Sequence, residues 1–76
     1  MRANPPHGEG LIDLEVGDML TIQQGTRTLT GRVKALHPVR GLVYAEVLAP
    51  GGIRFFRQHV CGAWKRLGEV VLGVRK

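Results

Sequence analysis

Turn-forming residues recur every 8 to 12 positions along this chain, and their spacing constrains the fold more than any other feature of the sequence. They are Gly17-Asp18, Gly25, His37-Pro38 with Gly41, and Ala49-Pro50-Gly51-Gly52. The segments between these turns alternate apolar and polar residues with a period of two, which is typical of half-buried strands rather than of helices. The chain is therefore predicted to fold as short strands in a meander.

The alternation predicts strands over Met19 to Gln24, Thr28 to Leu36, Leu42 to Leu48, Ile53 to Gln58 and Glu69 to Val74. The segment from residue 58 to residue 67 fits either a strand or a helix. The apolar residues at helical spacing around Gly62 are Val60, Ala63, Trp64 and Leu67. This spacing favours a single helical turn near His59 to Gly62. The predicted fold class is all-β: a small barrel of five or six strands with one short helical turn before the last strand.

With 76 residues, of which 43% are apolar, the chain has room for one small domain. Residues 1–10 hold two prolines and two glycines, so we predict a flexible N-terminal arm there and a single barrel domain over residues 11–76. The one cysteine, Cys61, cannot form an internal disulfide. No apolar stretch approaches the ~20 residues of a bilayer span, and the start of the chain lacks the apolar segment of a signal peptide, so a cytoplasmic location is expected.

Charge is divided unevenly along the chain, whose formal net charge is +5. Residues 1–18 carry one base and four acids, for a balance of −3, and residues 19–76 carry ten bases and two acids, for a balance of +8. Eight of the eleven bases are arginine, whose guanidinium suits phosphate, carboxylate and aromatic partners. A genomic bias toward arginine codons explains the arginine excess equally well, but it does not explain why the acids gather at one end.

Alternation also divides the side chains of the three middle strands between two faces. The predicted inner face holds the small and apolar residues Leu29, Gly31, Val33, Ala35, Val43, Ala45, Val47, Ile53 and Phe55. The predicted outer face holds Arg32, Lys34, Tyr44, Arg54 and Phe56. Phe55 is thus expected in the core and Phe56 in contact with solvent.

Bases interleaved with aromatic rings on a solvent-facing sheet are typical of a nucleic-acid-binding surface. Cationic side chains neutralise phosphates and release counterions, and flat rings stack on bases or wedge between base steps. Little sequence specificity is expected, because no recognition helix is predicted. The predicted nucleic-acid-binding residues are Arg32, Lys34, Tyr44, Arg54, Phe56, Arg27 and Arg57.

Two of the aromatic residues also have simpler structural interpretations. Tyr44 and Phe56 can instead form a cross-strand pair that only stabilises the sheet. Trp64 either plugs the end of the barrel, as its register with Val60 and Leu67 favours, or stacks on a base.

The segment Leu14-Glu15-Val16-Gly17-Asp18-Met19-Leu20-Thr21-Ile22 is followed by Gly25 and by Leu29-Thr30-Gly31-Arg32-Val33-Lys34-Ala35-Leu36. This order resembles the opening of KOW-type and other Src-homology-3-like small β-barrels, over about residues 14–67. Gly31 matches the glycine of the motif, whereas the glycine-rich loop is reduced to Gly25-Thr26-Arg27 and the motif's second glycine is missing. The resemblance implies a small barrel that binds nucleic acid, a peptide or a methylated lysine. The four aromatic residues are too few to favour a methyl-lysine cage.

Residues for catalysis or metal binding are not grouped in this sequence. The chain has no serine, and His7, His37, His59 and Cys61 lack the spacing of zinc ligands. We therefore expect a non-catalytic binding module with no metal and no cofactor, whose favoured partner is DNA or RNA rather than a membrane. The alternative is a protein-interaction adaptor or regulator, such as one encoded by a virus, whose basic face docks an acidic partner protein. Self-association through exposed strand edges is a third possibility.

Overall fold

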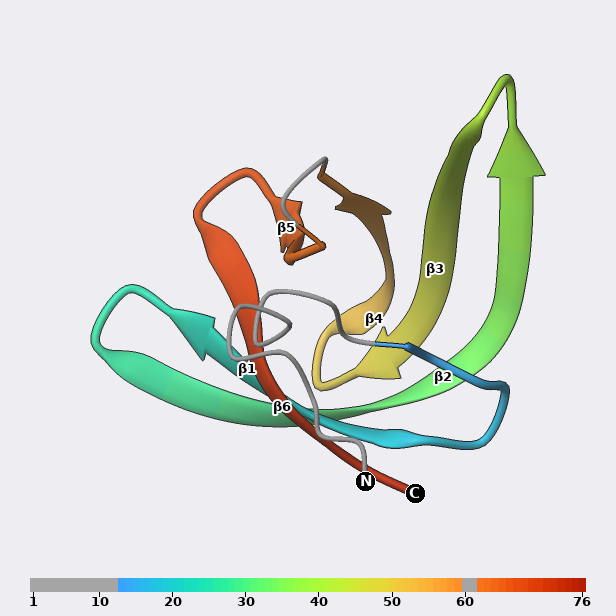
Figure 1. The fold of residues 1–76 in the computed structure, drawn as a ribbon. Coiled ribbons are helices and arrows are strands. Elements are labelled where there is room, and N and C mark those ends of the chain that lie inside the picture. Colours follow the sequence, from blue (N-terminus) through green and yellow to red (C-terminus); the bar gives the residue numbers. More distant parts are fainter. Residues whose placement is uncertain (1–12, 60–61) are drawn as a thin grey trace, which may run out of the picture.

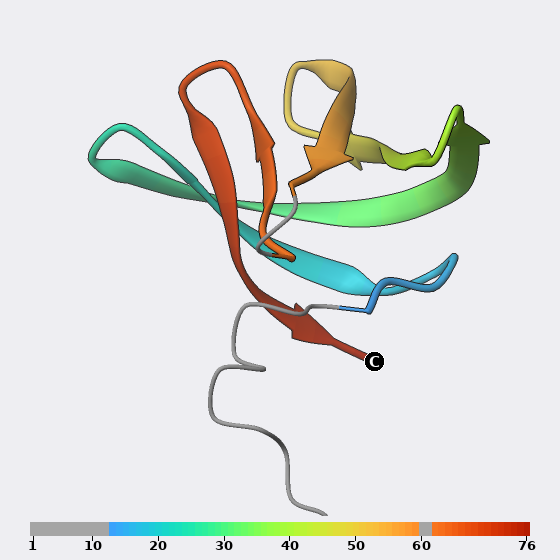
Figure 2. The ribbon, with the colours of Figure 1, turned by 45° about the horizontal axis from the view of Figure 1, so that its top comes forward.

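The computed structural model describes residues 13–59 and 62–76, and all the regular structure in these ranges is β-strand. The strands are β1 Met19–Gln24, β2 Arg27–Val39, β3 Leu42–Ala49, β4 Gly52–Gln58, β5 Trp64–Arg66 and β6 Glu69–Arg75. Each strand is antiparallel to the next, and β6 also pairs with β1, so the sheet closes into a barrel (Figure 1 and Figure 2). The predicted all-β barrel in meander order is confirmed. The predicted N-terminal arm, residues 1–10, lies outside the described residues.

Strand β1 has the predicted bounds, whereas β2 continues beyond the predicted end at Leu36 to Val39. Pro38 lies within this extension, opposite Val43 of β3. The extension is possible because β1 pairs with β2 only as far as Arg32, so the missing N–H of Pro38 does not interrupt a second ladder. The hairpin formed by β2 and β3 therefore extends past β1 (Figure 1).

The segment that fitted either a strand or a helix contains β5. In the described residues there is no helix, and Trp64 is a buried strand residue while Leu67 is 95% exposed in the turn that follows. Their expected alignment on one helical face is therefore wrong. The expected turn near His59 falls partly on residues 60–61, which lie outside the described residues; the Gly62 N–H donates to the His59 carbonyl at 2.7 Å.

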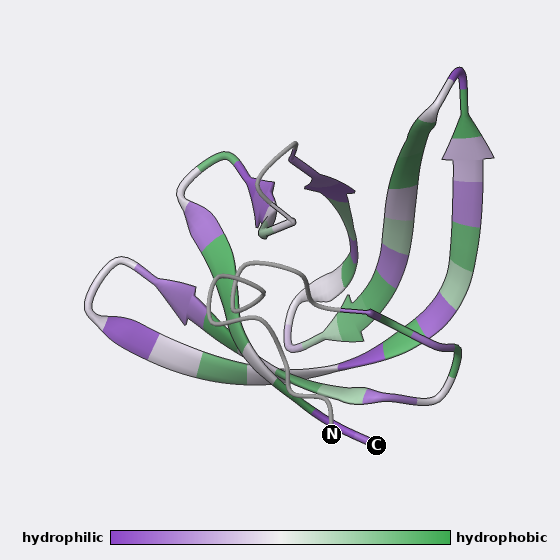
Figure 3. Cartoon of the chain, in the orientation of Figure 1, coloured by the Kyte–Doolittle hydropathy of each residue, from purple (hydrophilic) through white to green (hydrophobic). Residues whose placement is uncertain are grey.

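The core fills the inside of the barrel with apolar side chains from every strand. Figure 3 shows apolar and polar residues alternating along β2 and β3, which is the pattern that predicted two faces. The buried core consists of Leu14, Leu20, Ile22, Val33, Ala45, Val47, Ala49, Phe56, Trp64 and Val71. Trp64 is 2% exposed, as expected of a residue that plugs the barrel rather than one that stacks on a ligand.

The prediction for the faces of β4 is wrong. Ile53 and Phe55 are 47% and 51% exposed, whereas Phe56 is fully buried. Arg54 also departs from the prediction, because its side chain is only 15% exposed. Phe56 and Arg54 therefore do not lie on the outer surface that was predicted to bind nucleic acid.

The register of the hairpin between β3 and β4 explains this inversion. Ala49 lies opposite Gly52, so only two residues form the loop, and Ala45 consequently lies opposite Phe56. Directly opposed residues of an antiparallel pair share a face, so Phe56 joins Ala45 in the core. Tyr44 lies opposite Arg57, so the predicted cross-strand pair of Tyr44 and Phe56 is also wrong.

An irregularity in β2 changes the face of a second predicted core residue. The register with β3 shifts between Val33 and Ala35, as at a β-bulge. Ala35 therefore lies opposite Glu46, while Leu36 takes the inward position opposite Ala45 and packs against the core. The predicted inward position of Ala35 is wrong for this reason.

Gly31 allows β2 to approach β3 closely in the middle of the barrel. A Cβ atom at this position would lie 2.6 Å from Val47 Cγ1 and 3.0 Å from Ile22 Cδ1. Both neighbours are fully buried core residues, which restricts their movement. Packing thus accounts for a glycine at the position where the resemblance to KOW-type barrels places one.

A corner before β1 is held together by the buried carboxylate of Asp18. Its Oδ2 accepts hydrogen bonds from the Glu15 N–H at 2.8 Å and from Lys76 Nζ at 3.0 Å. Burial raises the pKa of Asp18, but the Glu15 hydrogen bond and the Lys76 ammonium together hold this pKa below its ordinary value of 3.8. The ionised carboxylate thus connects the corner to the end of β6.

Because Asp18 has a lowered pKa in the folded state, it stabilises the fold fully above pH 3.8 and loses this contribution as the pH falls through the folded-state pKa. We expect Asp18→Asn to be less stable than wild type at neutral pH and the difference to shrink in acid. Urea unfolding between about pH 2.5 and 7 measures this. Asp13→Asn, which changes an exposed carboxylate, is the control. Parallel loss of stability by wild type and Asp18→Asn throughout the acid range would contradict the prediction.

Candidate functional site

A row of polar and aromatic residues crosses the outer surface of four neighbouring strands. His37 of β2 lies opposite Tyr44 of β3, Tyr44 lies opposite Arg57 of β4, and Arg57 lies opposite Lys65 of β5. Opposed residues share a face, so all four side chains leave the barrel on the same side. His37, Arg57 and Lys65 are exposed and Tyr44 is half-buried.

Phe55 places a second aromatic ring beside this row. It lies on β4 opposite Glu46, in the next outward-facing position from Arg57. Its ring centroid is 6.0 Å from that of His37, and the two rings are tilted by 45°. Since Phe55 is 51% exposed, about half of its surface remains available for contact.

The two aromatic rings and the two cations line one groove over β3, β4 and β5. Its volume is about 460 Å³, within the ~300–1,000 Å³ typical of ligand sites. Leu67, in the turn between β5 and β6, forms part of its border and is 95% exposed. The residues that line the groove are Tyr44, Phe55, Arg57, His59, Lys65, Arg66 and Leu67. We call these residues the β3–β5 groove.

The β3–β5 groove carries positive charge that the described part of the chain does not neutralise. Neither Arg57 nor Lys65 makes an ion pair within residues 13–59 and 62–76. Glu46, which lies opposite Phe55, makes its ion pair with His37 instead, with its Oε1 2.9 Å from His37 Nε2. Arg57 and Lys65 are therefore available to an anionic ligand.

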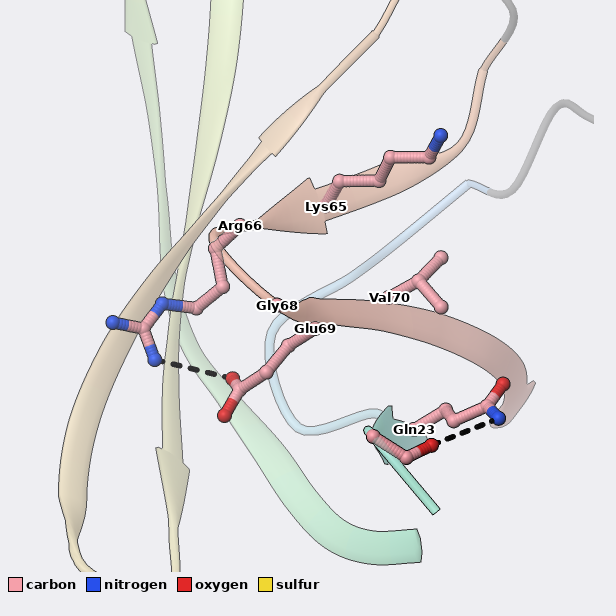
Figure 4. Close-up of a pocket in the computed structure, with 7 residues that line it drawn as sticks. Gln23, Lys65, Arg66, Gly68, Glu69 and Val70 are labelled. Atoms are coloured by element: carbon pink, nitrogen blue, oxygen red, sulfur yellow. Dashed lines mark hydrogen bonds and ion pairs between the residues drawn. The ribbon is translucent and has the colours of Figure 1, made fainter. Parts of the chain in front are cut away.

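A second hollow, of about 450 Å³, adjoins the first near the β5–β6 turn (Figure 4). Its chemistry is dominated by Glu69, whose side chain is only 3% exposed. Glu69 accepts hydrogen bonds from Gln24 Nε2 at 2.6 Å and from Arg66 Nη1 at 3.1 Å. In Figure 4 the Arg66 guanidinium points to Glu69, whereas the Lys65 side chain points away from it.

Arg54 completes this network from inside the barrel. Its Nη1 lies 3.1 Å from Glu69 Oε2, in an orientation that makes an ion pair but no hydrogen bond, and its Nη2 donates to the Pro50 carbonyl at 3.0 Å. The network of Gln24, Arg54, Arg66 and Glu69 closes one end of the barrel. Because its carboxylate is already shared by two guanidinium groups, we interpret this network as structural.

The structure brings only part of the predicted binding set together. Tyr44 and Arg57 line the β3–β5 groove. Arg32 and Lys34 are exposed on β2, outside this groove, with Arg32 Nη1 3.4 Å from the Gly17 carbonyl. Arg27 is exposed at the β1–β2 turn.

The predicted set also contains two residues whose side chains lie inside the barrel, and it omits five that line the groove. Phe56 lies in the core and Arg54 in the Glu69 network, so their predicted position on the outer face is wrong. Sequence reasoning missed Phe55, His59, Lys65, Arg66 and Leu67. The two-residue loop before β4 could have revealed Phe55, because it sets the register of the hairpin; nothing local to the sequence places Lys65 opposite Arg57.

The described residues form neither a metal-binding cluster nor a membrane-spanning helix. Within residues 13–59 and 62–76, no three histidine, cysteine or acidic side chains are placed to hold a metal ion. The same ranges contain no apolar helix of membrane-spanning length. Comparison of the chain with family models, with curated proteins and with solved structures gives no match.

Proposed function

We propose that this protein is a non-catalytic module that binds nucleic acid, with low sequence specificity, through the β3–β5 groove. The observation that carries the proposal is the convergence of two accessible rings, Tyr44 and Phe55, with two cations, Arg57 and Lys65, that have no acidic partner among residues 13–59 and 62–76. The closed six-stranded meander also supports the proposed relationship to Src-homology-3-like barrels.

Each component of the groove matches one part of a nucleotide. Arginine and lysine neutralise phosphates and release condensed counterions, which makes binding dependent on salt. Aromatic side chains stack on bases of any sequence, because every base has a flat face. With no helix in the described residues to read a major groove, we expect the groove to bind many sequences similarly.

A salt titration with matched variants tests this proposal. If Arg57, Lys65, Arg32 and Lys34 contact three or four phosphates, the slope of log K against log[salt] is expected to be about −2 to −4. Arg57→Gln should reduce that slope by about 0.7–0.9. Arg75→Gln removes an equal charge from the end of β6, five residues beyond Val70, which lies opposite Lys65, and should leave binding nearly unchanged.

Fluorescence anisotropy with labelled duplex DNA, single-stranded DNA and RNA measures these slopes. The proposal fails if wild type binds none of the three at low salt. It also fails if Arg75→Gln weakens binding as much as Arg57→Gln does, since the attraction would then be a property of net charge alone.

A second candidate function is supported by an apolar strip next to the groove. Leu48 and Ile53 lie opposite each other on the outer face of β3 and β4, 46% and 47% exposed. Arg32, also exposed, lies opposite Leu48 on the other side. An acidic protein with apolar contact residues matches this strip. An adaptor function requires a stoichiometric protein partner that survives nuclease treatment and is lost in Ile53→Glu but kept in Tyr44→Ala.

A further inference from the structure

The two rings of the β3–β5 groove differ in exposure, and Tyr44 is the one set into the surface. Tyr44 is half-buried and Phe55 is 51% exposed, and both lie in a groove that also includes residues of β5 and of the β5–β6 turn. A side chain that wedges between the base pairs of a duplex must project into the stack. A half-buried ring such as Tyr44 instead requires the base to enter the groove.

The cations lie beside the rings, at a distance set by the sheet. Arg57 lies directly opposite Tyr44, and Lys65 lies one strand further. Neighbouring strands are about 4.8 Å apart, so the strands that carry Arg57 and Lys65 are roughly 5 and 10 Å from the strand that carries Tyr44. A ligand that fills the groove therefore presents a flat aromatic face and its phosphates to the same surface.

Only an unpaired nucleotide presents both groups in this way. In a duplex the faces of the bases are covered by their neighbours in the stack and the phosphates lie outside, so one groove cannot contact both. In a single strand the bases can unstack and lie on side-chain rings while the backbone follows a line of cations. The row formed by Arg57 and Lys65 is such a line.

We propose that the β3–β5 groove is selective for single-stranded nucleic acid, with one base on Tyr44, Phe55 as the second ring beside it, and the adjoining phosphates on Arg57 and Lys65. This inference rests on the proposed function and names its substrate class. The exposed Leu67, on the border of the groove, supplies an apolar contact for the edge of the bound base.

The test compares a labelled dT12 oligonucleotide, a U12 RNA and a 12-base-pair duplex by fluorescence anisotropy at one salt concentration. We expect both single strands to bind at least about tenfold more tightly than the duplex. Tyr44→Ala should weaken single-strand binding by roughly 5- to 150-fold, the loss typical of one stacked base, and should change duplex binding by less than about twofold.

Matched variants separate stacking from apolar contact and from misfolding. Tyr44→Phe keeps the ring and should bind like wild type, whereas Tyr44→Leu keeps an apolar side chain without a ring and should bind like Tyr44→Ala. Phe55→Ala changes an exposed residue and gives an independent test of the second ring.

Two outcomes overturn the inference and leave the proposed function intact: a duplex that binds as tightly as the single strands, or a Tyr44→Leu variant that binds them like wild type. Absence of binding to all three ligands overturns both proposals.

Discussion

Phe56→Ala is expected to lower the free energy of unfolding by about 3–5 kcal/mol, whereas Phe55→Ala should lower it by less than about 1 kcal/mol. The two residues are adjacent and chemically identical, but Phe56 is fully buried and Phe55 is 51% exposed. Truncation of Phe56 removes a large ring from a core that also contains Ala45 and Val47 and leaves a cavity. A core of this size supplies only about 3–5 kcal/mol, so we expect Phe56→Ala to be largely unfolded at 25 °C.

Circular dichroism and urea unfolding of both variants measure the contrast. Nucleic-acid binding adds a second measurement, because Phe55→Ala should remain folded and yet bind single strands more weakly. If the two substitutions cost similar stability, or if Phe55→Ala is the more damaging, the register assigned to the β3–β4 hairpin is wrong.

Glu69→Leu is expected to destabilise the barrel by about 3 kcal/mol, the lower end of the range for breaking a buried ion pair. Its carboxylate is 3% exposed and lies within 3.1 Å of guanidinium nitrogens of both Arg54 and Arg66. Removal of this carboxylate leaves the Arg54 guanidinium, on a side chain only 15% exposed, without its counter-charge. An uncompensated buried charge costs more than the pair contributes when both partners are present.

A double-mutant cycle with Arg54→Met separates the ion pair from simple packing. The double variant Arg54→Met with Glu69→Leu should be more stable than the sum of the two single effects implies, since no unpaired charge remains at that end of the barrel. The exposed pair of His37 and Glu46 is the control: His37→Gln should cost less than about 1 kcal/mol. Strict additivity of the Arg54 and Glu69 effects would contradict the assigned network.

The sequence predicted the elements of this fold better than the directions of its side chains. Strand β1 was predicted with its observed bounds because Gly17-Asp18 and Gly25 mark both ends and the alternation between them is regular. Alternation within a strand leaves open which of its two faces points inward. For β4 that choice depended on the two-residue loop at Pro50-Gly51, which had to be combined with the better-defined faces of β3.

The candidate groove was predicted only in part, because the sequence marks the strand that carries Arg57 much more clearly than the strand that carries Lys65. Arg57 lies beside Tyr44 through a hairpin that the sequence marks clearly. Lys65 joins them from a strand of only three residues, in a segment whose apolar spacing also fits a helix. Pairing between β4 and β5 is a tertiary choice that local propensity does not encode.

The short β5 also determines where the barrel has the fewest pairs between neighbouring strands. Within the described residues it is joined to β4 by two residue pairs and to β6 by two, whereas β1 and β2 share six. Local opening begins where few backbone hydrogen bonds hold neighbouring segments together. The pairings of β5 with β4 and with β6 are therefore expected to open first. A ligand that binds both Arg57 of β4 and Lys65 of β5 would connect these two strands. Ligand binding would therefore reduce local opening between β4 and β5.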